Sequence, residues 1–294
     1  MILVAGSANL DFVVRAPRIP APGETMLGRE FRTYPGGKCA NQAIACARAG
    51  GVATEMLLAL GDDPFAAPIE QSLAAAGVRT HVVRVSDEPT GTAFICVSDD
   101  AENAITVAPG ANSRLRAPHL PPLDGCTHLL LQLEIPIEAV TAYARVAHAR
   151  GIKIVLNAAP ARALPPELVS VVDVLVVNTG ELEVVSGHRG SVEQCLERID
   201  LPGVVVTLGE RGCCARVAGR LQTQNGFAVT AVDTTAAGDT FCGVLVAGFS
   251  RGLDLAEALR QANAAGALAC TRPGAQSSIP TRAELQSFLQ CRSA

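Results

Sequence analysis

Short apolar runs alternate along the chain with longer segments in which apolar residues recur at helical spacing. The apolar runs predict β-strands at Ile2–Ala5, Thr54–Leu60, His128–Leu133, Lys153–Leu156, Asp173–Val177 and Gly203–Leu208. The periodic segments predict helices at Ala40–Ala49, Pro64–Ala76, Ile137–Arg150, Gly238–Arg251, Leu255–Cys270 and Ala283–Leu289, the last preceded by a Thr281–Glu284 capping box. This alternation indicates an α/β fold in which helices cover a mainly parallel central sheet. We expect residues 1–294 to form a single domain.

Two segments depart from this alternation. Asp11–Tyr34 and Thr92–Val107 read as short strands and turns, and they are too polar for the interior of a parallel sheet. We predict that they form a small β-sheet lid near residues 11–34 and 92–107. Ligands of parallel α/β sheets bind at the carboxyl ends of the strands, so the lid is expected to lie there.

The composition excludes several classes of protein. The chain has 294 residues, is 49% hydrophobic and carries a formal net charge of −4, which suits a protein with a sizeable core. Its Lys and Arg residues are scattered and form no basic stripe, so we expect no nucleic-acid partner. The opening Met1–Ala5 has no basic leader, and no apolar run is long enough to cross a bilayer. We therefore predict a cytoplasmic protein with no membrane partner.

Cysteine and histidine spacings predict no metal site. The ten cysteines include no CxxC pair, and most have apolar neighbours. Buried free thiols in a reducing compartment explain them better than disulfides or zinc. The five histidines form no HExxH or similar ligand spacing. The sequence therefore does not support catalytic zinc.

The segment Asp233–Phe241, which reads DTTAAGDTF, carries the most informative pattern. It follows a strand-like run at Ala228–Val232 and opens a predicted helix. The small residues Ala236–Gly238 would let a ligand approach the amides of the first helical turn, which lack partners within the helix. A carboxylate beside such an anion site suits a general base, so Asp239 is a candidate. An ordinary helix start with an acidic first turn is an equal alternative.

Three loops carry polar residues in apolar surroundings, on the side expected to bind substrate. Gly6–Asp11 could present the side chains of Asn9 and Asp11 to vicinal hydroxyls, although alone it is an ordinary polar turn. Gly36–Asn41 supplies amides, an ammonium and a carboxamide but does not match the Walker pattern, so a P-loop NTPase is not expected. Gln132–Glu134 ends an apolar strand with a carboxylate, which is costly there unless it is paired, exposed or bound to ligand.

Two further loops are suited to a nucleotide. Asn178–Glu181 offers oxygen ligands three residues apart, a spacing that suits hydrated magnesium. A capping asparagine followed by an acidic residue at a helix start explains the same residues and is favoured when they are taken alone. Thr207–Gly212 ends a strand with two glycines that would let the backbone approach a nucleotide. A β-hairpin turn explains this loop equally well.

As a set, the motifs resemble the ribokinase branch of the PfkB family of carbohydrate kinases over nearly the whole chain. They are GSANLD at 6–11, GGKCANQA at 36–43, QLE at 132–134, NAAPAR at 157–162, TLGERG at 207–212, DTTAAGDTF at 233–241 and TRPGAQSSIP at 271–280. The resemblance implies a ribokinase-like fold with a small β-sheet lid, and a homodimer formed through that lid. It also implies transfer of the ATP γ-phosphate to the primary hydroxyl of a sugar, with ribose 5-phosphate as the product.

The same resemblance assigns roles to individual residues. Asp239 would be the catalytic base, and the amides of Ala236, Ala237 and Gly238 would form the anion hole. The sugar would contact Asn9, Asp11, Gly37, Lys38, Asn41, Glu134 and Asp239. The ATP site would include Asn178, Thr207, Gly209, Glu210, Arg211, Gly212, Gly238 and Asn263, with Asn178 and Glu181 organising magnesium, in part through water. A potassium site would use Asp233, Thr235, Ala269, Arg272, Gly274 and Ser278, mostly through carbonyl oxygens.

The chain departs from the family pattern at three places. Cys39 stands where glycine is usual, Thr179-Gly180 interrupts a stretch that is typically more acidic, and Asn263 occupies a position often held by histidine. None of these departures removes a catalytic group. Cys39 bears on the shape of the sugar pocket and is expected to expose an oxidisable thiol near the substrate.

Other functions of the same fold stay open at this point. Deoxyribose, fructose, phosphorylated fructose and nucleosides are alternative acceptors within the family. The GSANLD and GGKCANQA motifs favour ribose, and deoxyribose is the hardest to separate because it differs by one hydroxyl. A regulatory protein that binds sugar on a disabled kinase fold is a further alternative. Asp239 and the complete anion-hole sequence argue against it.

Overall fold

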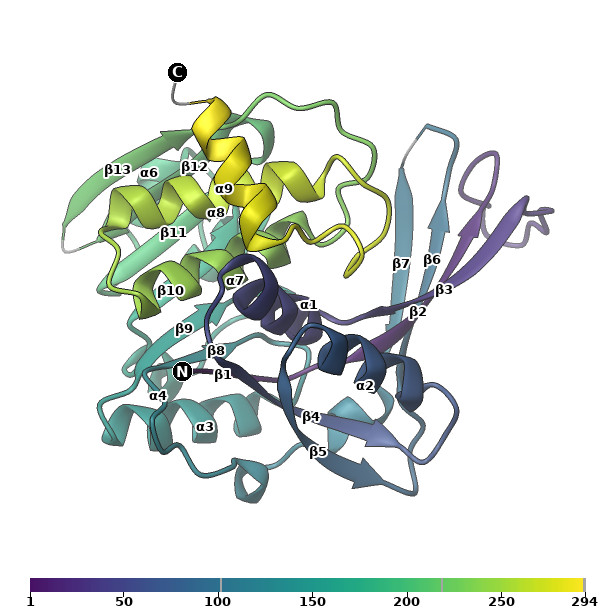
Figure 1. Ribbon diagram of the computed structural model, residues 1–294, viewed down its shortest axis with the longest axis horizontal. Coiled ribbons are helices and arrows are strands. Elements are labelled where there is room, and N and C mark those ends of the chain that lie inside the picture. The colour runs from purple at the N-terminus through teal and green to yellow at the C-terminus, as the bar shows by residue number, and fades with distance from the viewer. Residues whose placement is uncertain (101, 218, 293–294) are drawn as a thin grey trace.

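A central sheet of nine strands organises the chain (Figure 1). The computed structural model describes residues 1–100, 102–217 and 219–292. In order across the sheet, the strands are β13 (Arg220–Asn225), β12 (Gly212–Val217), β11 (Gly203–Thr207), β10 (Val174–Asn178), β9 (Lys153–Asn157), β8 (His128–Leu131), β1 (Ile2–Ala5), β4 (Thr54–Gly61) and β5 (Arg79–Val85). The strands from β11 to β5 are parallel, and β12 and β13 form an antiparallel edge. The predicted α/β class is confirmed.

Helices cover both faces of this sheet. Every residue of β1 and β4 is buried, as expected for parallel strands between two layers. Ile2 and Val4 pack into one hydrophobic core, while Leu3 and Ala5 pack into the other. The first core contains α1 (Lys38–Ile44), α2 (Ala66–Ala75), α7 (Ala237–Ser250), α8 (Leu255–Ala269) and α9 (Arg282–Cys291). The second contains α3 (Ile137–Ala149), α4 (Pro166–Val169), α5 (Thr179–Ser186) and α6 (Val192–Leu196).

A second sheet of four strands projects to one side of the central sheet (Figure 1). Its order is β3 (Glu30–Gly36), β2 (Asn9–Arg15), β6 (Gly91–Val97) and β7 (Asn103–Ala108). We call it the small sheet. It contains both segments that the sequence predicts as a lid. Since β2 follows β1 directly, the small sheet begins at the carboxyl edge of the central sheet.

Most predicted strands and helices form within a few residues of the expected bounds, with two differences. The predicted strand at Ala228–Val232 is wrong, because this run has no strand partner and instead lines a cavity described below. The helix predicted over Ala40–Ala49 forms as α1 followed by a π-helical turn, η1 (Ala45–Ala49), whose Gly50 N–H donates to the Ala45 carbonyl over 2.9 Å. The capping box at Thr281 and Glu284 is confirmed.

The remaining described helices are short 3₁₀ turns: η2 (Gly110–Arg114), η3 (Ala117–His119) and η4 (Gly209–Arg211). Across the described ranges, the structure has no helix with both the length and the apolarity that crossing a membrane requires.

Candidate active site

Two cavities meet beside the carboxyl ends of the central strands. From β1, the strands β4 and β5 are added on one side of the sheet, whereas β8 and the strands after it are added on the other side. Open α/β sheets bind ligands at the point where the strand order changes direction in this way. One cavity, of about 690 Å³, lies between this edge and the small sheet. The other, of about 760 Å³, lies between the β11–β12 connection and helices α7 and α8. Thr234, just before α7, lines both cavities.

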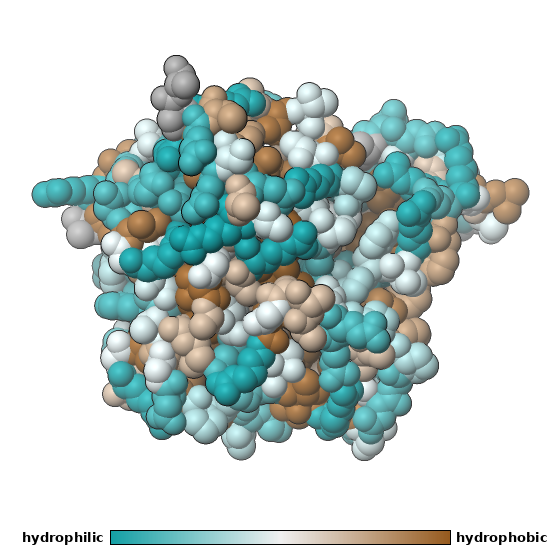
Figure 2. All heavy atoms as spheres, in the orientation of Figure 1, coloured by the Kyte–Doolittle hydropathy of each residue, from teal (hydrophilic) through white to brown (hydrophobic). Residues whose placement is uncertain are grey.

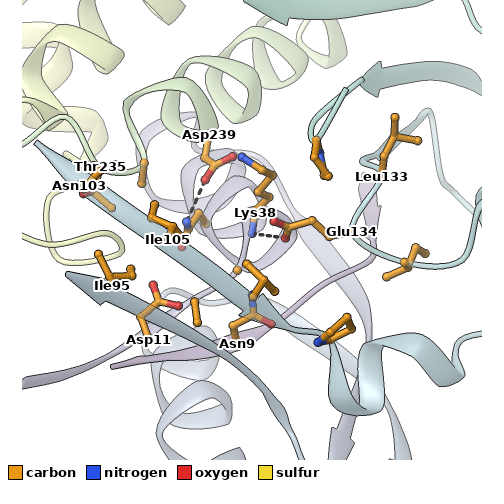
Figure 3. A pocket seen from close by; sticks show the side chains of 18 of the residues that line it. Asn9, Asp11, Lys38, Ile95, Asn103, Ile105, Leu133, Glu134, Thr235 and Asp239 are labelled. Atoms are coloured by element: carbon orange, nitrogen blue, oxygen red, sulfur yellow. Dashed lines mark hydrogen bonds between the residues drawn. The ribbon is translucent and has the colours of Figure 1, made fainter. Parts of the chain in front are cut away.

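The first cavity gathers every residue predicted to bind sugar. Asn9, Asp11, Gly37, Lys38, Asn41, Glu134 and Asp239 all line it. They come from β2, α1, the loop after β8 and the first turn of α7, which are far apart in sequence. The small sheet contributes the apolar side chains of Ile95 and Ile105 to its wall (Figure 3), and Val107 also lines the cavity. The cavity is thus polar at its base and apolar on the side of the small sheet.

Asp239 is held by amide groups on both of its carboxylate oxygens. Its side chain is buried, and Asn41 Nδ2 donates to Oδ2 while Gln42 Nε2 donates to Oδ1, each over 2.9 Å. An ordinary acidic residue at a helix start is solvated and interacts mainly with the helix dipole. Asp239 instead lies inside a cavity with a fixed orientation, which favours the interpretation of a general base over that of a simple helix start.

Gln42 belongs to a buried chain of amides that the sequence does not predict. Gln42 Nε2 also donates to Asn157 Oδ1 over 3.0 Å, and Gln42 Oε1 accepts a hydrogen bond from Gln132 Nε2. Asn157 Nδ2 donates in turn to the Val176 carbonyl of β10 over 3.1 Å. The only sequence signal for Gln42 is its position inside the GGKCANQA motif. These bonds orient the Gln42 amide so that its NH₂ group faces Asp239.

The first turn of α7 leaves backbone donors available. Ala236, which precedes the helix, adopts a left-handed conformation with φ 58°, a strained state for a residue with a Cβ. The Ala237 N–H donates to the Thr234 carbonyl over 3.2 Å, so this donor already has a partner. Among the described residues, the N–H groups of Gly238 and Asp239 have no acceptor. A Cβ on Gly238 would meet open space, so a ligand can approach this backbone closely.

The charged groups of the first cavity influence one another strongly. Burial, together with the nearby carboxylates of Glu134 and Asp239, raises the pKa of Asp11 to about 7. Burial also raises the pKa of Glu134, whose Oε2 accepts hydrogen bonds from Ser7 Oγ at 2.5 Å and Lys38 N at 3.3 Å. The Lys38 ammonium extends toward Asp239 (Figure 3), and its attraction to the Asp239 carboxylate raises the pKa of Lys38. A cation and three carboxylates therefore share one buried site.

The substitution Asp11→Asn should stabilise the fold, and should do so more at pH 8 than at pH 4. A carboxyl whose pKa is near 7 when folded and 3.8 when unfolded holds its proton more tightly in the folded state. The folded state therefore loses stability as pH rises from about 4 to 7, and the penalty is complete above pH 7. Removing it should add roughly 2 kcal/mol to the free energy of unfolding at pH 8. Denaturant titrations at both pH values would measure this.

The exposed Asp124 provides the matched control for that substitution. Asp124→Asn makes the same chemical change on the surface and should leave the free energy of unfolding nearly unchanged at both pH values. A gain in Asp11→Asn that is equal at pH 4 and pH 8 would contradict the buried, titrating Asp11.

The second cavity gathers most of the residues predicted to bind the nucleotide. Thr207, Gly209, Glu210, Arg211, Gly212, Ala237, Gly238 and Asn263 line it. The loop Thr207–Gly212 joins β11 to the antiparallel β12, so it is a hairpin connection and a cavity wall at once. Asn263 of α8 donates to the Asn225 carbonyl over 2.7 Å, which closes the cavity beside β13. Phe227 and Ala228 complete the wall, and Ala228 is the first residue of the run predicted as a strand.

Comparison with known proteins identifies the family. A family model described as "pfkB family carbohydrate kinase" matches residues 1–282. The chain belongs to the pfkB family of carbohydrate kinases. It is 38% identical to a ribokinase of Haemophilus influenzae and 32% identical to a deoxyribokinase of Salmonella typhi, covering 98% of both chains in each comparison. Ribokinase from Arabidopsis thaliana, solved with ribose and ATP, has a TM-score of 0.89 at 30% identity over 98% of each chain.

Membership of this family shows an enzyme that transfers a phosphoryl group to a sugar hydroxyl. In this pfkB-family kinase, the two cavities share Thr234, just before α7, in their lining. The family resemblance and the fold class predicted from the sequence are confirmed.

The two residues predicted for magnesium do not line either cavity. Asn178 and Glu181 form a capping box at the start of α5, in which each side chain accepts a hydrogen bond from the other residue's backbone N–H over 2.8 Å. The interpretation as a helix start is therefore confirmed. Burial raises the pKa of Glu181, and Lys38 and Asp239 also act on it, so its carboxylate is within electrostatic reach of the site. No cluster of three acidic, histidine or cysteine ligands occurs in the described part of this kinase.

The residues predicted for potassium surround the segment that leads into α7. Asp233 Oδ1 accepts a hydrogen bond from Thr235 N over 2.9 Å, and Asp233 Oδ2 accepts one from Gly274 N over 2.8 Å. These bonds join the 271–280 loop to the residues just before Ala236. Of the predicted set, Thr235 lines the first cavity, whereas its lining does not include Asp233, Ala269, Arg272, Gly274 or Ser278.

Cys39 does not expose a thiol to the substrate. Its side chain is buried, and its thiol donates to Gln132 Oε1 rather than facing either cavity. The expectation of an exposed thiol near the substrate is therefore wrong. Burial raises the pKa of Cys39 well above its usual range, which makes it a poor nucleophile.

Proposed function

We propose that this kinase transfers the γ-phosphoryl group of ATP to the 5-hydroxyl of D-ribose, giving ribose 5-phosphate and ADP. One observation carries the proposal. The Asp239 carboxylate faces the first cavity, while the backbone of Ala237 and Gly238, in the same helical turn, lines the second. A sugar in the first cavity and a nucleotide in the second would meet at this turn. The homologues named ribokinase support ribose as the acceptor.

Asp239 acts as the general base in this mechanism. It takes the proton of the 5-hydroxyl as the hydroxyl oxygen forms a bond to the γ-phosphorus. The bond from that phosphorus to the β,γ-bridging oxygen breaks, and ADP leaves with the electron pair. The unpaired N–H groups of Gly238 and Asp239 stabilise the transferring phosphoryl group, and the Lys38 ammonium adds a nearby positive charge. The proton on Asp239 is then released to solvent.

The remaining polar groups of the first cavity orient the sugar. Asn9 Oδ1 accepts a hydrogen bond from the buried Asn112 Nδ2 over 2.8 Å, which fixes the Asn9 carboxamide. Among the described residues the Asp11 side chain has no hydrogen-bond partner, so its carboxyl oxygens, which line the cavity, are available to sugar hydroxyls. We assign Asn9, Asp11 and Glu134 to hydroxyl recognition. Apolar side chains of the small sheet exclude water above the sugar.

The residues near the nucleotide cavity fit a hydrated magnesium ion. Mg²⁺ usually keeps several waters and takes few protein ligands, so the absence of an acidic cluster in the described ranges is compatible with it. Glu181 would hold it through water, and the bound ion would neutralise charge on the ATP phosphates. We assign this role to Glu181 with Asn178 in support.

Measurement of ADP release tests the proposed acceptor. Purified protein with Mg-ATP and potassium should turn over D-ribose faster than 2-deoxy-D-ribose, fructose or adenosine at matched concentrations. Faster turnover of deoxyribose would assign the deoxyribokinase activity that the Salmonella typhi relative carries in its name. Sugar binding without ADP release from any acceptor would overturn the enzymatic proposal and favour a sugar-binding regulatory protein.

We propose that potassium activates this kinase. The family resemblance supports this proposal, and the Asp233 carboxylate, which accepts hydrogen bonds from Thr235 N and Gly274 N, supplies a negative charge beside the 271–280 loop. An ion there would brace the segment that positions Ala236 and the first turn of α7. Turnover should fall several-fold when sodium replaces potassium at constant ionic strength. Equal rates in the two salts would remove the potassium proposal.

We also propose a homodimer formed through the small sheet, in a reducing, cytoplasmic compartment. Phe31 and Phe94 of the small sheet are 62% and 55% exposed, and Figure 2 shows hydrophobic side chains on this projecting part of the molecule. All ten cysteines are free thiols, as a reducing compartment maintains them. Sedimentation equilibrium should give twice the mass of one chain, and Phe94→Ser should shift the equilibrium toward one chain. A wild-type protein that stays monomeric at about 50 μM would contradict the dimer.

A further inference from the structure

Three of the four strands of the small sheet begin or end close to one buried side chain, that of Asn112. Asn112 lies in η2, which follows the end of β7, while Asn9 opens β2 and Gly91 opens β6. A Cβ on Gly91 would clash with the side chains of both Asn112 and Asn9. The Ala111 N–H, next to Asn112, donates to the Pro89 carbonyl over 2.7 Å. Asn112 is therefore packed between three chain segments at the root of the small sheet.

The Asn112 carboxamide has one orientation that satisfies its surroundings. Its Oδ1 accepts a hydrogen bond from Ala8 N over 3.1 Å, while its Nδ2 donates to the Ala8 carbonyl over 3.1 Å and to Asn9 Oδ1 over 2.8 Å. If the amide were turned over, its oxygen would face two acceptors and its NH₂ group would face the Ala8 N–H. Asn112 is 1% exposed, and buried polar groups are costly without partners. The backbone of Ala8 therefore fixes the direction in which the Asn112 amide points.

The fixed Asn112 amide determines which group of Asn9 is available to the first cavity. Asn112 does not line that cavity, whereas Asn9 does. Asn9 Oδ1 is occupied by Asn112, and Asn9 Nδ2 has no partner among the described residues. An amide nitrogen can only donate, so Asn9 offers the cavity a donor. Asn9 and Asp11 are two residues apart on β2 and project from the same face of the strand, so this donor lies beside a carboxyl group that can accept (Figure 3).

We propose that Asn112 is a positioning residue that sets the sugar specificity of this kinase by holding Asn9 with its NH₂ group toward the sugar. One sugar hydroxyl can then accept from Asn9 and donate to Asp11 at once. With the Asn9 amide turned over, two acceptors would face that hydroxyl, which has one proton to share between them. A sugar that lacks the hydroxyl leaves both groups unpaired, and polar sites discriminate most strongly in this situation. The inference rests on the proposed function, because it takes the first cavity as the sugar site.

A double-mutant cycle between positions 112 and 9 tests the proposal. D-ribose is titrated calorimetrically into the wild type, Asn112→Ala, Asn9→Ala and the double variant, without nucleotide. We expect Asn112→Ala to weaken ribose affinity by about tenfold in the wild-type background and by less than about twofold in the Asn9→Ala background, because its effect passes through Asn9. Equal losses in the two backgrounds would show a structural role that is independent of Asn9 and would overturn the proposal, as would unchanged affinity in Asn112→Ala.

Kinetics separate positioning of the sugar contact from a general loss of stability. In Asn112→Ala the KM for the sugar should rise with the loss of affinity, while kcat and the KM for ATP stay within about threefold of the wild type, since neither Asn112 nor Asn9 lines the nucleotide cavity. Thr54→Val is the control: it removes a buried 2.8 Å bond to the Val52 carbonyl at the amino end of β4 and should leave ribose affinity unchanged. A KM for ATP that rises as much as that for the sugar would contradict the positioning role.

Deoxygenated sugars test the effect on specificity. The kcat/KM of D-ribose is compared with those of 2-deoxy-D-ribose and 3-deoxy-D-ribose in the wild type and in Asn112→Ala. The analogue that lacks the hydroxyl held by Asn9 should be nearly insensitive to Asn112→Ala, so the preference for ribose over that analogue should fall several-fold. If neither preference falls, Asn112 does not set specificity.

Asn112→Asp decides the matter if Asn112→Ala fails to fold. It keeps the size of the side chain and an acceptor for Ala8 N but offers Asn9 no NH₂ group, so it should also weaken ribose affinity, and wild-type affinity in this variant would overturn the proposal. Failure of the proposed function has a different signature. A wild type that binds D-ribose without turning it over loses the proposed activity, while the binding cycle still reports on Asn112. If the wild type does not bind D-ribose, the cycle is run with the acceptor that gives the fastest ADP release.

Discussion

Asp239→Asn should lower kcat by about three orders of magnitude while leaving a folded protein that still binds sugar and nucleotide. Asp239 lies in the helical turn shared by the two cavities, and its carboxylate is placed to take a proton from the acceptor hydroxyl. Asparagine has nearly the same shape but cannot act as a base. It also presents an NH₂ group to one of the two donors that now face Asp239, so a modest loss of stability should accompany the loss of turnover.

The measurement combines ADP release with calorimetric titration of ribose and of an ATP analogue. Asp254→Asn serves as the matched control because Asp254 caps α8 through a 2.8 Å bond to Glu257 N, a role that asparagine fills equally well. That variant should retain wild-type turnover. If Asp239→Asn kept more than about a tenth of the wild-type kcat, Asp239 would not be the general base.

Most elements of the central sheet could be predicted from sequence because their signals are local. The buried strand Ile2–Ala5 forms at the predicted bounds, since a short apolar run can be buried on both faces only between two layers. Helix α3 begins at the predicted Ile137 for a similar reason, its apolar residues recurring along one face. The edge strand β13, which reads RLQTQN, was not predicted because its residues are mostly polar and partly exposed.

The wrong strand at Ala228–Val232 shows the limit of the same reasoning. An apolar run signals burial or a cavity wall, and it does not say whether a hydrogen-bonding partner exists. Here the run passes along the second cavity, where Val232 N bonds to the Cys270 carbonyl over 2.7 Å and no strand lies beside it. Backbone pairing is decided by the tertiary arrangement, which the run itself does not encode.

In the candidate site, too, some residues could be predicted from the sequence and others could not. Side chains that follow strand ends, such as Asn9 and Glu134, could be predicted to converge because parallel strands bring their carboxyl ends to one edge. Gln42 could not, since it lies inside a helix and its partners Asp239, Asn157 and Gln132 are 197, 115 and 90 residues away along the chain. No local pattern reports contacts of that range.

The amide chain leads to the second large effect, in which Gln42→Met should lower kcat by about 100-fold with little change in either KM. Methionine keeps the length of the side chain but removes its donors and its acceptor. Asp239 Oδ1 then loses its 2.9 Å bond, and the carboxylate is held only through Asn41. A misplaced base reduces turnover steeply, because the productive geometry is narrow. Gln42 lines neither cavity, so substrate binding should be nearly unaffected.

Kinetics and a second variant separate positioning from a merely structural role. Gln42→Met also leaves Asn157 Oδ1 and Gln132 Nε2 without their partner, so the free energy of unfolding should fall by roughly 2–4 kcal/mol.

Gln42→Glu keeps an acceptor for Gln132 but places a second carboxylate against Asp239, so its turnover should rise with pH more steeply than that of the wild type. Gln71→Met, on the exposed side of α2, is the control for the change itself and should match the wild type. If Gln42→Met kept kcat within about threefold of the wild type, or changed KM instead, the amide chain would not hold Asp239 in its working orientation.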